Sequence, residues 1–273
     1  MIQLIREEST HREYFVQFPL IATDFQPTEP VVEFEWFEST TPGRHPAILF
    51  NPILGGDYPL EQGICRHLAR HGFQVALVHR KTLKVSPDQP VSAIELLLRQ
   101  GIFRIRQVVD WMAARETVDP TRMGSFGVSM GGIASVITAA VEPRLRCHFI
   151  ALAGGSIPDI LMSSNDRLLA KPRARYVAQN HMDLATMDRL LRQEIRTDPM
   201  RLAPYVDATR LFMVIALGDR TIGRSNALRL WRALGRPKAI FLPFGHYTTY
   251  LTLPYLNYIS LRFFNERLMA ASP

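Results

Sequence analysis

One pentapeptide constrains the fold of this chain more than any other part of it: Gly127-Val128-Ser129-Met130-Gly131. Residues 122–128 have the pattern of a short buried strand, and residues 132–140 have that of an apolar helix. Where a strand turns this sharply into a helix, the backbone passes too close for side chains, which explains the two flanking glycines. The sequence therefore predicts a tight strand–helix turn that exposes the Ser129 hydroxyl beside the free amides of the helix start.

Strand and helix patterns alternate along the remainder of the chain. Residues 46–50 and 73–79 are continuous apolar runs, typical of strands that are covered on both faces. Strands are expected at residues 13–19, 31–37, 46–50, 73–79, 122–128, 147–153, 210–217 and 239–243. Helices are expected at residues 60–71, within 90–115, at 132–140, 184–196 and 226–234, and near the C-terminus. This alternation predicts an α/β fold: a mostly parallel central sheet with helices on both faces.

A segment at about residues 156–206 interrupts the alternation. It has no strand signal, and it carries a helical stretch rich in arginine and aspartate at 184–196. Because the segment falls between two predicted strands, we interpret it as a small helical cap insertion. The remainder of the chain is expected to form one domain, so that residues 1–273 are a single domain with this insertion.

Composition excludes several other classes of protein. The hydrophobic fraction of 47% fits a globular core, and two cysteines, Cys65 and Cys147, argue against a disulfide framework. The N-terminus lacks an apolar stretch of signal-peptide length, and the longest apolar run, about 131–141, is too short to span a bilayer. A cytoplasmic location is therefore expected. The net charge of +7 comes mostly from scattered arginines without a clustered stripe, which argues against nucleic-acid binding.

The strand–serine–helix turn resembles the nucleophile elbow of the α/β-hydrolase superfamily. The resemblance covers the chain from about residue 31 to its end. It is to serine esterases and lipases, with the dienelactone-hydrolase-like branch as one option. It implies an α/β-hydrolase fold and a nucleophilic Ser129, followed along the chain by an acid and a histidine.

Asp219 is the expected acid of this triad. It follows the predicted strand 210–217 and resembles the superfamily's strand-end acid, although Ile222-Gly223 stands where a Val-Pro pair is usual. Such an acid orients the imidazole and stabilises its cation without taking the proton itself. Two alternatives remain: Asp219 as a solvated turn residue, since Gly-Asp favours turns, and Asp159 as the acid, placed soon after the preceding strand.

His246 is the expected general base. It follows Gly245 just past the last predicted strand, where the superfamily has a Gly-His pair. Imidazole titrates near neutrality, so it can take the proton of a serine hydroxyl and then give it to a leaving group. The alternative is a structural histidine that caps the C-terminal helix.

An oxyanion hole needs two backbone N–H donors. The resemblance implies Met130, directly after the nucleophile, and one residue of the loop that follows the strand 46–50. Pro52 in that loop has no N–H. Leu54 is the expected second donor by alignment with the superfamily's loop, and Ile53 is the alternative.

Together these residues predict a serine hydrolase that cleaves a small-molecule ester through an acyl-enzyme on Ser129. No cofactor or metal is expected. The same triad could serve a thioesterase, an amidase, a C–C bond hydrolase or a cofactor-free haloperoxidase. In a different class, the chain could be a catalytically silent hydrolase-fold binding protein. The intact set of Ser129, Asp219 and His246 argues against this, because binding alone does not need all three.

Other polar patterns have simpler structural explanations. Cys65, His67 and His71 have a spacing that can bind a metal, but they lack further ligands, so metal binding is not expected.

The aromatic residue most expected to reach the pocket is Tyr247, beside His246. The cap arginines are expected to form a solvated, salt-bridged helix face rather than an anion site. They are Arg167, Arg173, Arg175, Arg189, Arg192, Arg196 and Arg201.

Overall fold

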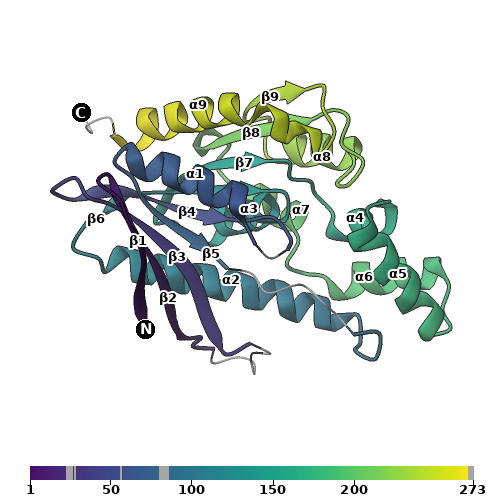
Figure 1. Ribbon diagram of the computed structural model, residues 1–273. Coiled ribbons are helices and arrows are strands. Elements are labelled where there is room, and N and C mark those ends of the chain that lie inside the picture. Colours follow the sequence, from purple (N-terminus) through teal and green to yellow (C-terminus); the bar gives the residue numbers. More distant parts are fainter. Residues whose placement is uncertain (23–26, 28, 56, 80–85, 270–273) are drawn as a thin grey trace.

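The computed structural model describes residues 1–22, 27, 29–55, 57–79 and 86–269. Within them, nine strands form one sheet in the order β1-β2-β3-β5-β4-β6-β7-β8-β9 (Figure 1). The strands are β1 (Ile2–Glu7), β2 (His11–Pro19), β3 (Val31–Ser39), β4 (His45–Asn51), β5 (Gln74–Val78), β6 (Val118–Val128), β7 (Leu145–Ala151), β8 (Leu211–Ala216) and β9 (Lys238–Leu242). Every neighbouring pair from β5 to β9 is parallel. The sheet is therefore mostly parallel, as the sequence predicts.

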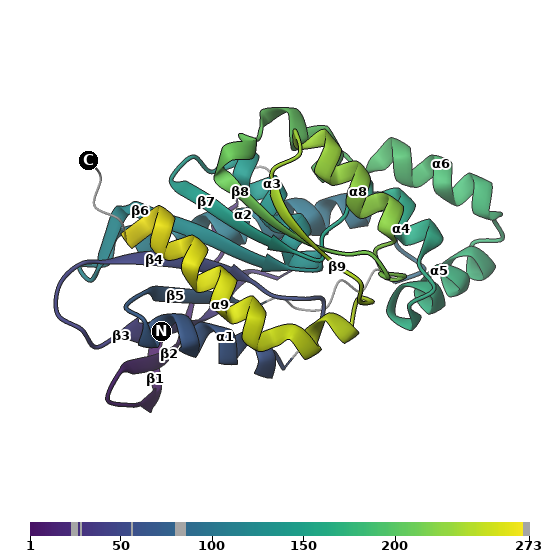
Figure 2. The ribbon, with the colours of Figure 1, turned by 90° about the horizontal axis from the view of Figure 1, so that it is seen from above.

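Helices cover both faces of this sheet (Figure 2). They are α1 (Pro59–Arg70), α2 (Ser92–Ala113), α3 (Met130–Val141), α4 (Ile157–Ser163), α5 (Arg167–Gln179), α6 (Leu184–Glu194), α7 (Pro199–Leu202), α8 (Arg224–Ala233) and α9 (Leu253–Phe264). Side chains alternate along each strand, so Phe50 packs with α1 and α9, whereas Leu49 packs with α2 and α3. All seven residues of β4 are buried, which accounts for its unbroken apolar sequence.

The edge strand β1 is not among the expected elements. It pairs with β2 in an antiparallel register, yet all six of its residues are exposed. An exposed edge strand has no buried face, and the apolar residues Ile2, Leu4 and Ile5 follow no sustained alternation that could predict it. The strand extends the antiparallel side of the sheet, opposite β9 in the strand order.

Between β7 and β8 the chain forms helices α4 to α7 and no strand. Figures 1 and 2 show α4, α5 and α6, coloured green, standing beyond the sheet on one side. Aspartates start three of these helices, because their carboxylates accept the amides that a helix start leaves free. Asp166 accepts from the amide of Leu168, and Asp183 from that of Thr186. In the described part of the chain, no helix is long and apolar enough to cross a membrane.

Candidate active site

Ser129 lies at the turn between β6 and α3. Its backbone φ of 55° is unusual for a residue with a side chain, and such strain recurs at functional sites. The turn is fixed by the Ser129 amide, which donates to the carbonyl of Ala151 at 2.8 Å. A Cβ on Gly131 would overlap the carbonyl oxygen of Asn51, and one on Gly127 would overlap the carbonyl of Gly131. Both glycines are therefore required by close backbone packing.

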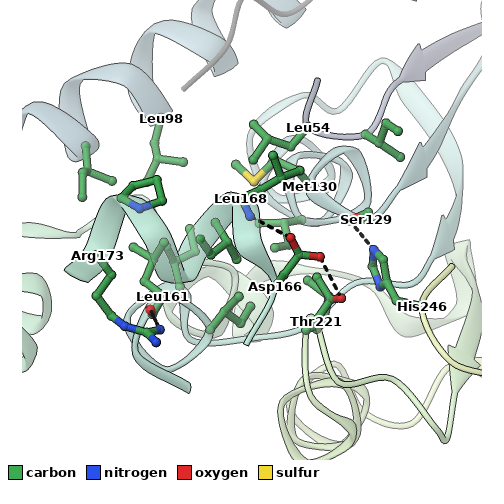
Figure 3. A pocket seen from close by; sticks show the side chains of 18 of the residues that line it. Leu54, Leu98, Ser129, Met130, Leu161, Asp166, Leu168, Arg173, Thr221 and His246 are labelled. Atoms are coloured by element: carbon green, nitrogen blue, oxygen red, sulfur yellow. Dashed lines mark hydrogen bonds between the residues drawn. The ribbon is translucent and has the colours of Figure 1, made fainter. Parts of the chain in front are cut away.

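The structure brings Ser129, His246 and Asp219 into one hydrogen-bonded chain. Ser129 Oγ lies 2.9 Å from His246 Nε2, the bond drawn in Figure 3, and His246 Nδ1 lies 2.7 Å from Asp219 Oδ2. With the Nδ1 proton donated to the carboxylate, Nε2 is free to accept from the serine hydroxyl. The three residues are 8%, 7% and 5% exposed, so their interactions are shielded from bulk water.

Hydrogen bonds from backbone amides fix the positions of the acid and the base. The amides of Thr221 and Ile222 donate to Asp219 Oδ1 at 2.8 and 2.9 Å, which leaves Oδ2 for the histidine. The loops after β8 and β9 are joined where Gly218 N donates to Phe244 O at 2.9 Å. A Cβ on Gly218 would lie 2.9 Å from that carbonyl oxygen, which is too close. A glycine before Asp219 therefore allows the two loops to approach each other.

Asp159, the alternative acid, is engaged elsewhere. Its carboxylate on α4 forms ion pairs with Arg192, at 2.5 Å, and with Arg229. The structure therefore places Asp219, and not Asp159, against the imidazole of His246.

The two expected oxyanion donors line the same pocket as Ser129. Met130 is the first residue of α3, so its amide has no acceptor within the helix. In the opposite loop the Ile53 amide lies close to the buried carboxyl of Glu61. Burial raises the pKa of Glu61, and the backbone amides of Glu61 and Ile53 partly offset this effect. Ile53 and Leu54 both line the pocket, so both remain candidates for the second donor; Gly56 of the same loop lies outside the described residues.

A cavity of about 280 Å³ opens at Ser129 and His246 (Figure 3). Tyr247 lines it as expected, together with Tyr250. The rest of the wall is largely aliphatic and comes from α2, α4 and α5. Representative side chains are Ile94, Leu97, Leu98, Ile157, Ile160 and Leu161.

Asp166, at the start of α5, connects the helical insertion to the triad loops. Its Oδ2 accepts from the hydroxyl of Tyr247 and, at 3.3 Å, from that of Thr221. Tyr247 follows His246 and packs edge-on against its ring at a centroid distance of 5.3 Å. Burial and the bond to Asp166 raise the pKa of Tyr247 to about 12, so it remains a donor. Sequence reasoning missed these hydrogen bonds, because Thr221 and Tyr247 are 55 and 81 residues away from Asp166 along the chain.

The cap arginines do not behave alike. Arg192 pairs with Asp159 and, at 2.9 Å, with Asp188, as expected for a salt-bridged helix face. Arg173 instead lines the pocket, and its Nη1 donates to the carbonyls of Leu161 and Ser164 at 2.6 and 3.0 Å.

Neither cysteine is suited to nucleophilic or metal chemistry in this environment. Burial raises the pKa of both thiols, that of Cys147 to about 12. Among the described residues, the one group of three potential ligands within reach of a common ion is Glu8, His11 and Glu13. Arg66 already binds Glu13 through two bonds of 2.8 and 3.1 Å, so this group is explained as an ion-pair cluster.

Comparison with known proteins identifies the family. The sequence profile of the prolyl oligopeptidase family matches residues 92–242, more than half of the chain, and the chain belongs to this family. The matched region contains Ser129 and Asp219 and ends just before His246. The predicted α/β-hydrolase fold is confirmed by this membership and by similarity to solved structures.

Three solved structures illustrate the similarity of fold. An acetyl xylan esterase from Paenibacillus sp. R4 superposes with a TM-score of 0.77 at 17% identity, over 98% of this chain and 88% of that one. Acetyl xylan esterase 1 from Thermoanaerobacterium sp. gives 0.70 at 18% identity, over 95% and 87%. The acylaminoacyl peptidase of Pyrococcus horikoshii gives 0.69 at 14% identity, over 97% of this chain and 43% of that one.

Curated relatives by sequence are two uncharacterized proteins of Mycobacterium tuberculosis, from strains CDC 1551 / Oshkosh and H37Rv. Each is 25% identical over 150 residues, which is 54% of this chain and 33% of the relative. The chain thus matches about a third of the length of these relatives.

Proposed function

We propose that this protein is a serine hydrolase that cleaves carboxylic esters through an acyl-enzyme on Ser129. The observation that carries the proposal is the continuous bonded chain from Ser129 through His246 to Asp219, placed at the mouth of an aliphatic cavity. Esterases among the structural neighbours support the reaction class.

The geometry supplies each step of such a reaction. His246 Nε2 accepts the Ser129 proton as Oγ attacks the ester carbonyl, while Asp219 stabilises the resulting imidazolium. The negative charge on the carbonyl oxygen is held by the amides of Met130 and of Leu54 or Ile53. His246 then protonates the departing alkoxide, which leaves an acyl group on Ser129. Water enters, gives a proton to His246, and releases the acid by the same steps in reverse.

We assign the insertion at about residues 156–206 to a cap over this cavity. Helices α4 and α5 contribute much of its aliphatic wall, and the tie between Asp166 and Tyr247 anchors α5 beside the base. A cap of this kind excludes water from the site, which strengthens the electrostatic interactions within it.

A fluorophosphonate probe followed by mass spectrometry tests the nucleophile. We expect one covalent adduct on Ser129, absent in Ser129→Ala and strongly reduced in His246→Ala. Ser163→Ala, which removes an exposed hydroxyl on α4, is the matched control and should label normally. A folded protein that neither labels nor hydrolyses p-nitrophenyl butyrate would instead be a hydrolase-fold binding protein. Comparison with a butyryl thioester and a butyryl anilide separates the esterase from thioesterase and amidase activities.

The two candidate acids are separated by Asp219→Asn and Asp159→Asn. The first change removes the charge that orients and stabilises the imidazolium, so kcat should fall by about 10³- to 10⁴-fold. The second leaves the triad intact, so kcat should stay within about threefold. Steady-state hydrolysis of p-nitrophenyl butyrate measures both, and a larger loss in Asp159→Asn would reverse the assignment of the acid.

A further inference from the structure

The cavity has two chemically different ends. Ser129 and His246 lie at one end, whereas Leu98, Leu161 and Arg173 lie at the other (Figure 3). The side chains that line the interval come from α2, α4 and α5 and are almost all aliphatic. A ligand that fills this space must therefore be apolar along most of its length.

Most polar side chains in this wall are already bonded to the protein. Asp166 accepts from Tyr247, Thr221 and the Leu168 amide. The hydroxyl of Tyr176 donates to the carbonyl of Gln89 at 2.9 Å. The wall would have to break these bonds to recognise sugar hydroxyls or peptide groups, and an unpaired buried polar group is unfavourable.

Among the described residues of the wall, the Tyr250 hydroxyl has no hydrogen-bond partner. Tyr250 lies in the short helix η3 (Thr248–Thr252), which directly follows His246 and Tyr247. A free hydroxyl thus follows the base closely along the chain, on the side of the cavity where an ester group would lie.

We infer that the site selects esters that carry an apolar chain of medium length, with the chain lying between α2 and the helices α4 and α5. This inference rests on the proposed function. A methylene group occupies about the volume of a water molecule, ~30 Å³, so 280 Å³ holds roughly nine such groups. The favoured chain therefore has about six to ten carbons.

Arg173 limits the length of this chain. Its guanidinium binds the carbonyls of Leu161 and Ser164, which ties α5 to the end of α4 at the far end of the cavity. Leu161 contributes its side chain to the wall and its carbonyl to this tie, so it sits where the chain ends. We assign Leu161 as a specificity-determining residue.

The first experiment is a series of p-nitrophenyl esters from acetate to laurate, with alkyl acetates of matched chain length as a second series. Burial of each methylene should raise kcat/KM by about two- to fourfold, giving at least ~50-fold from acetate to octanoate and a decline beyond decanoate. A rise in the first series assigns the chain to the acyl side, and a rise in the second assigns it to the alcohol side. Turnover of acetate by Ser129 with no rise in either series overturns the inference but keeps the esterase. No turnover and no fluorophosphonate adduct overturns both.

Leu161→Trp and Met162→Trp test the position of the chain end. Both residues are half-buried on α4, but only Leu161 lines the cavity. Leu161→Trp should lower the octanoate-to-acetate ratio of kcat/KM by at least about tenfold, whereas Met162→Trp should leave the ratio within twofold. Leu161→Ala, which enlarges the far end, should move the best substrate to a longer chain. Equal ratios in all three variants would overturn the assignment of Leu161.

Discussion

The two walls of the cavity are built in different ways. The triad wall consists of turns at the ends of β6, β8 and β9, fixed by backbone hydrogen bonds and by glycines that admit no Cβ. The helical wall is attached by side chains: in α5, Tyr176 is the one buried residue, and a proline lies inside the helix at 172. Backbone bonds define a reacting geometry closely, whereas side-chain packing can change with little effect on the sheet. The residues that carry out the reaction therefore belong to the turns of the sheet, whereas the residues that select the substrate belong to the helical wall.

The largest expected effect tests the triad wall. In Gly131→Ala the new methyl would overlap the carbonyl of Asn51, and backbone cannot yield as a flexible side chain can. We expect loss of folded protein or a fall in kcat/KM of at least about 100-fold, because the elbow and the Met130 amide would move. Expression yield, circular dichroism and p-nitrophenyl butyrate turnover measure this.

Gly101→Ala is the matched control for that substitution. Gly101 lies inside α2, and nothing is within 4 Å of a Cβ built there. Alanine favours the helix by roughly 0.5–1 kcal/mol over glycine, so this variant should be slightly more stable and fully active. If Gly131→Ala behaves like Gly101→Ala, the elbow is less tightly constrained than its geometry indicates.

An intermediate effect concerns acid stability, which we expect to originate in the sheet. His148 on β7 is fully buried with Nδ1 2.8 Å from Ser125 Oγ, and burial lowers its pKa to about 3. The imidazole is therefore neutral in the folded protein, while in the unfolded chain it takes up a proton near pH 6.5. Its stability contribution is present above pH 6.5 and is lost as the pH falls toward 3, by about 3 kcal/mol between pH 7 and pH 4.

Urea unfolding at pH 7 and pH 4 checks this, with the double variant Ser125→Ala/His148→Leu as the comparison. The double variant leaves neither partner unpaired and removes the titrating group. Its loss of stability between the two pH values should be smaller than that of the original protein by about the amount attributed to His148. Equal losses would place the acid sensitivity elsewhere, for example in the buried carboxylate of Glu142 with its ion pair to Arg144.

The same contrast decides what the sequence could predict. Each triad residue follows the end of a strand by one to four residues and lies within two residues of a glycine, so local sequence reports both the turn and the reactive group. Parallel strands end at one edge of the sheet, and this brings Ser129, Asp219 and His246 together without any knowledge of side-chain packing.

The helical wall was predictable only as a helical segment. Its contribution to the site depends on long-range contacts, such as that between Asp166 and Tyr247. Neither helical periodicity nor strand alternation in the sequence reveals such a contact. Likewise, the burial of Glu61 beside the loop after β4 was not predictable, because a carboxyl on an amphipathic helix is ordinarily expected on the solvent face.

The smallest expected effect tests the attachment between the two walls. Tyr247→Phe removes the hydroxyl that donates to Asp166 but keeps the ring against His246. Since one bond to a charged group is lost, amide hydrogen exchange at the start of α5 should quicken about three- to tenfold, while β6 and β8 keep their protection. Tyr255→Phe, on the exposed side of α9, is the control and should leave exchange in α5 unchanged. Faster exchange in β8 as well would mean that the insertion and the sheet unfold as one unit, and the separation of chemistry from selectivity would then be weaker than we argue.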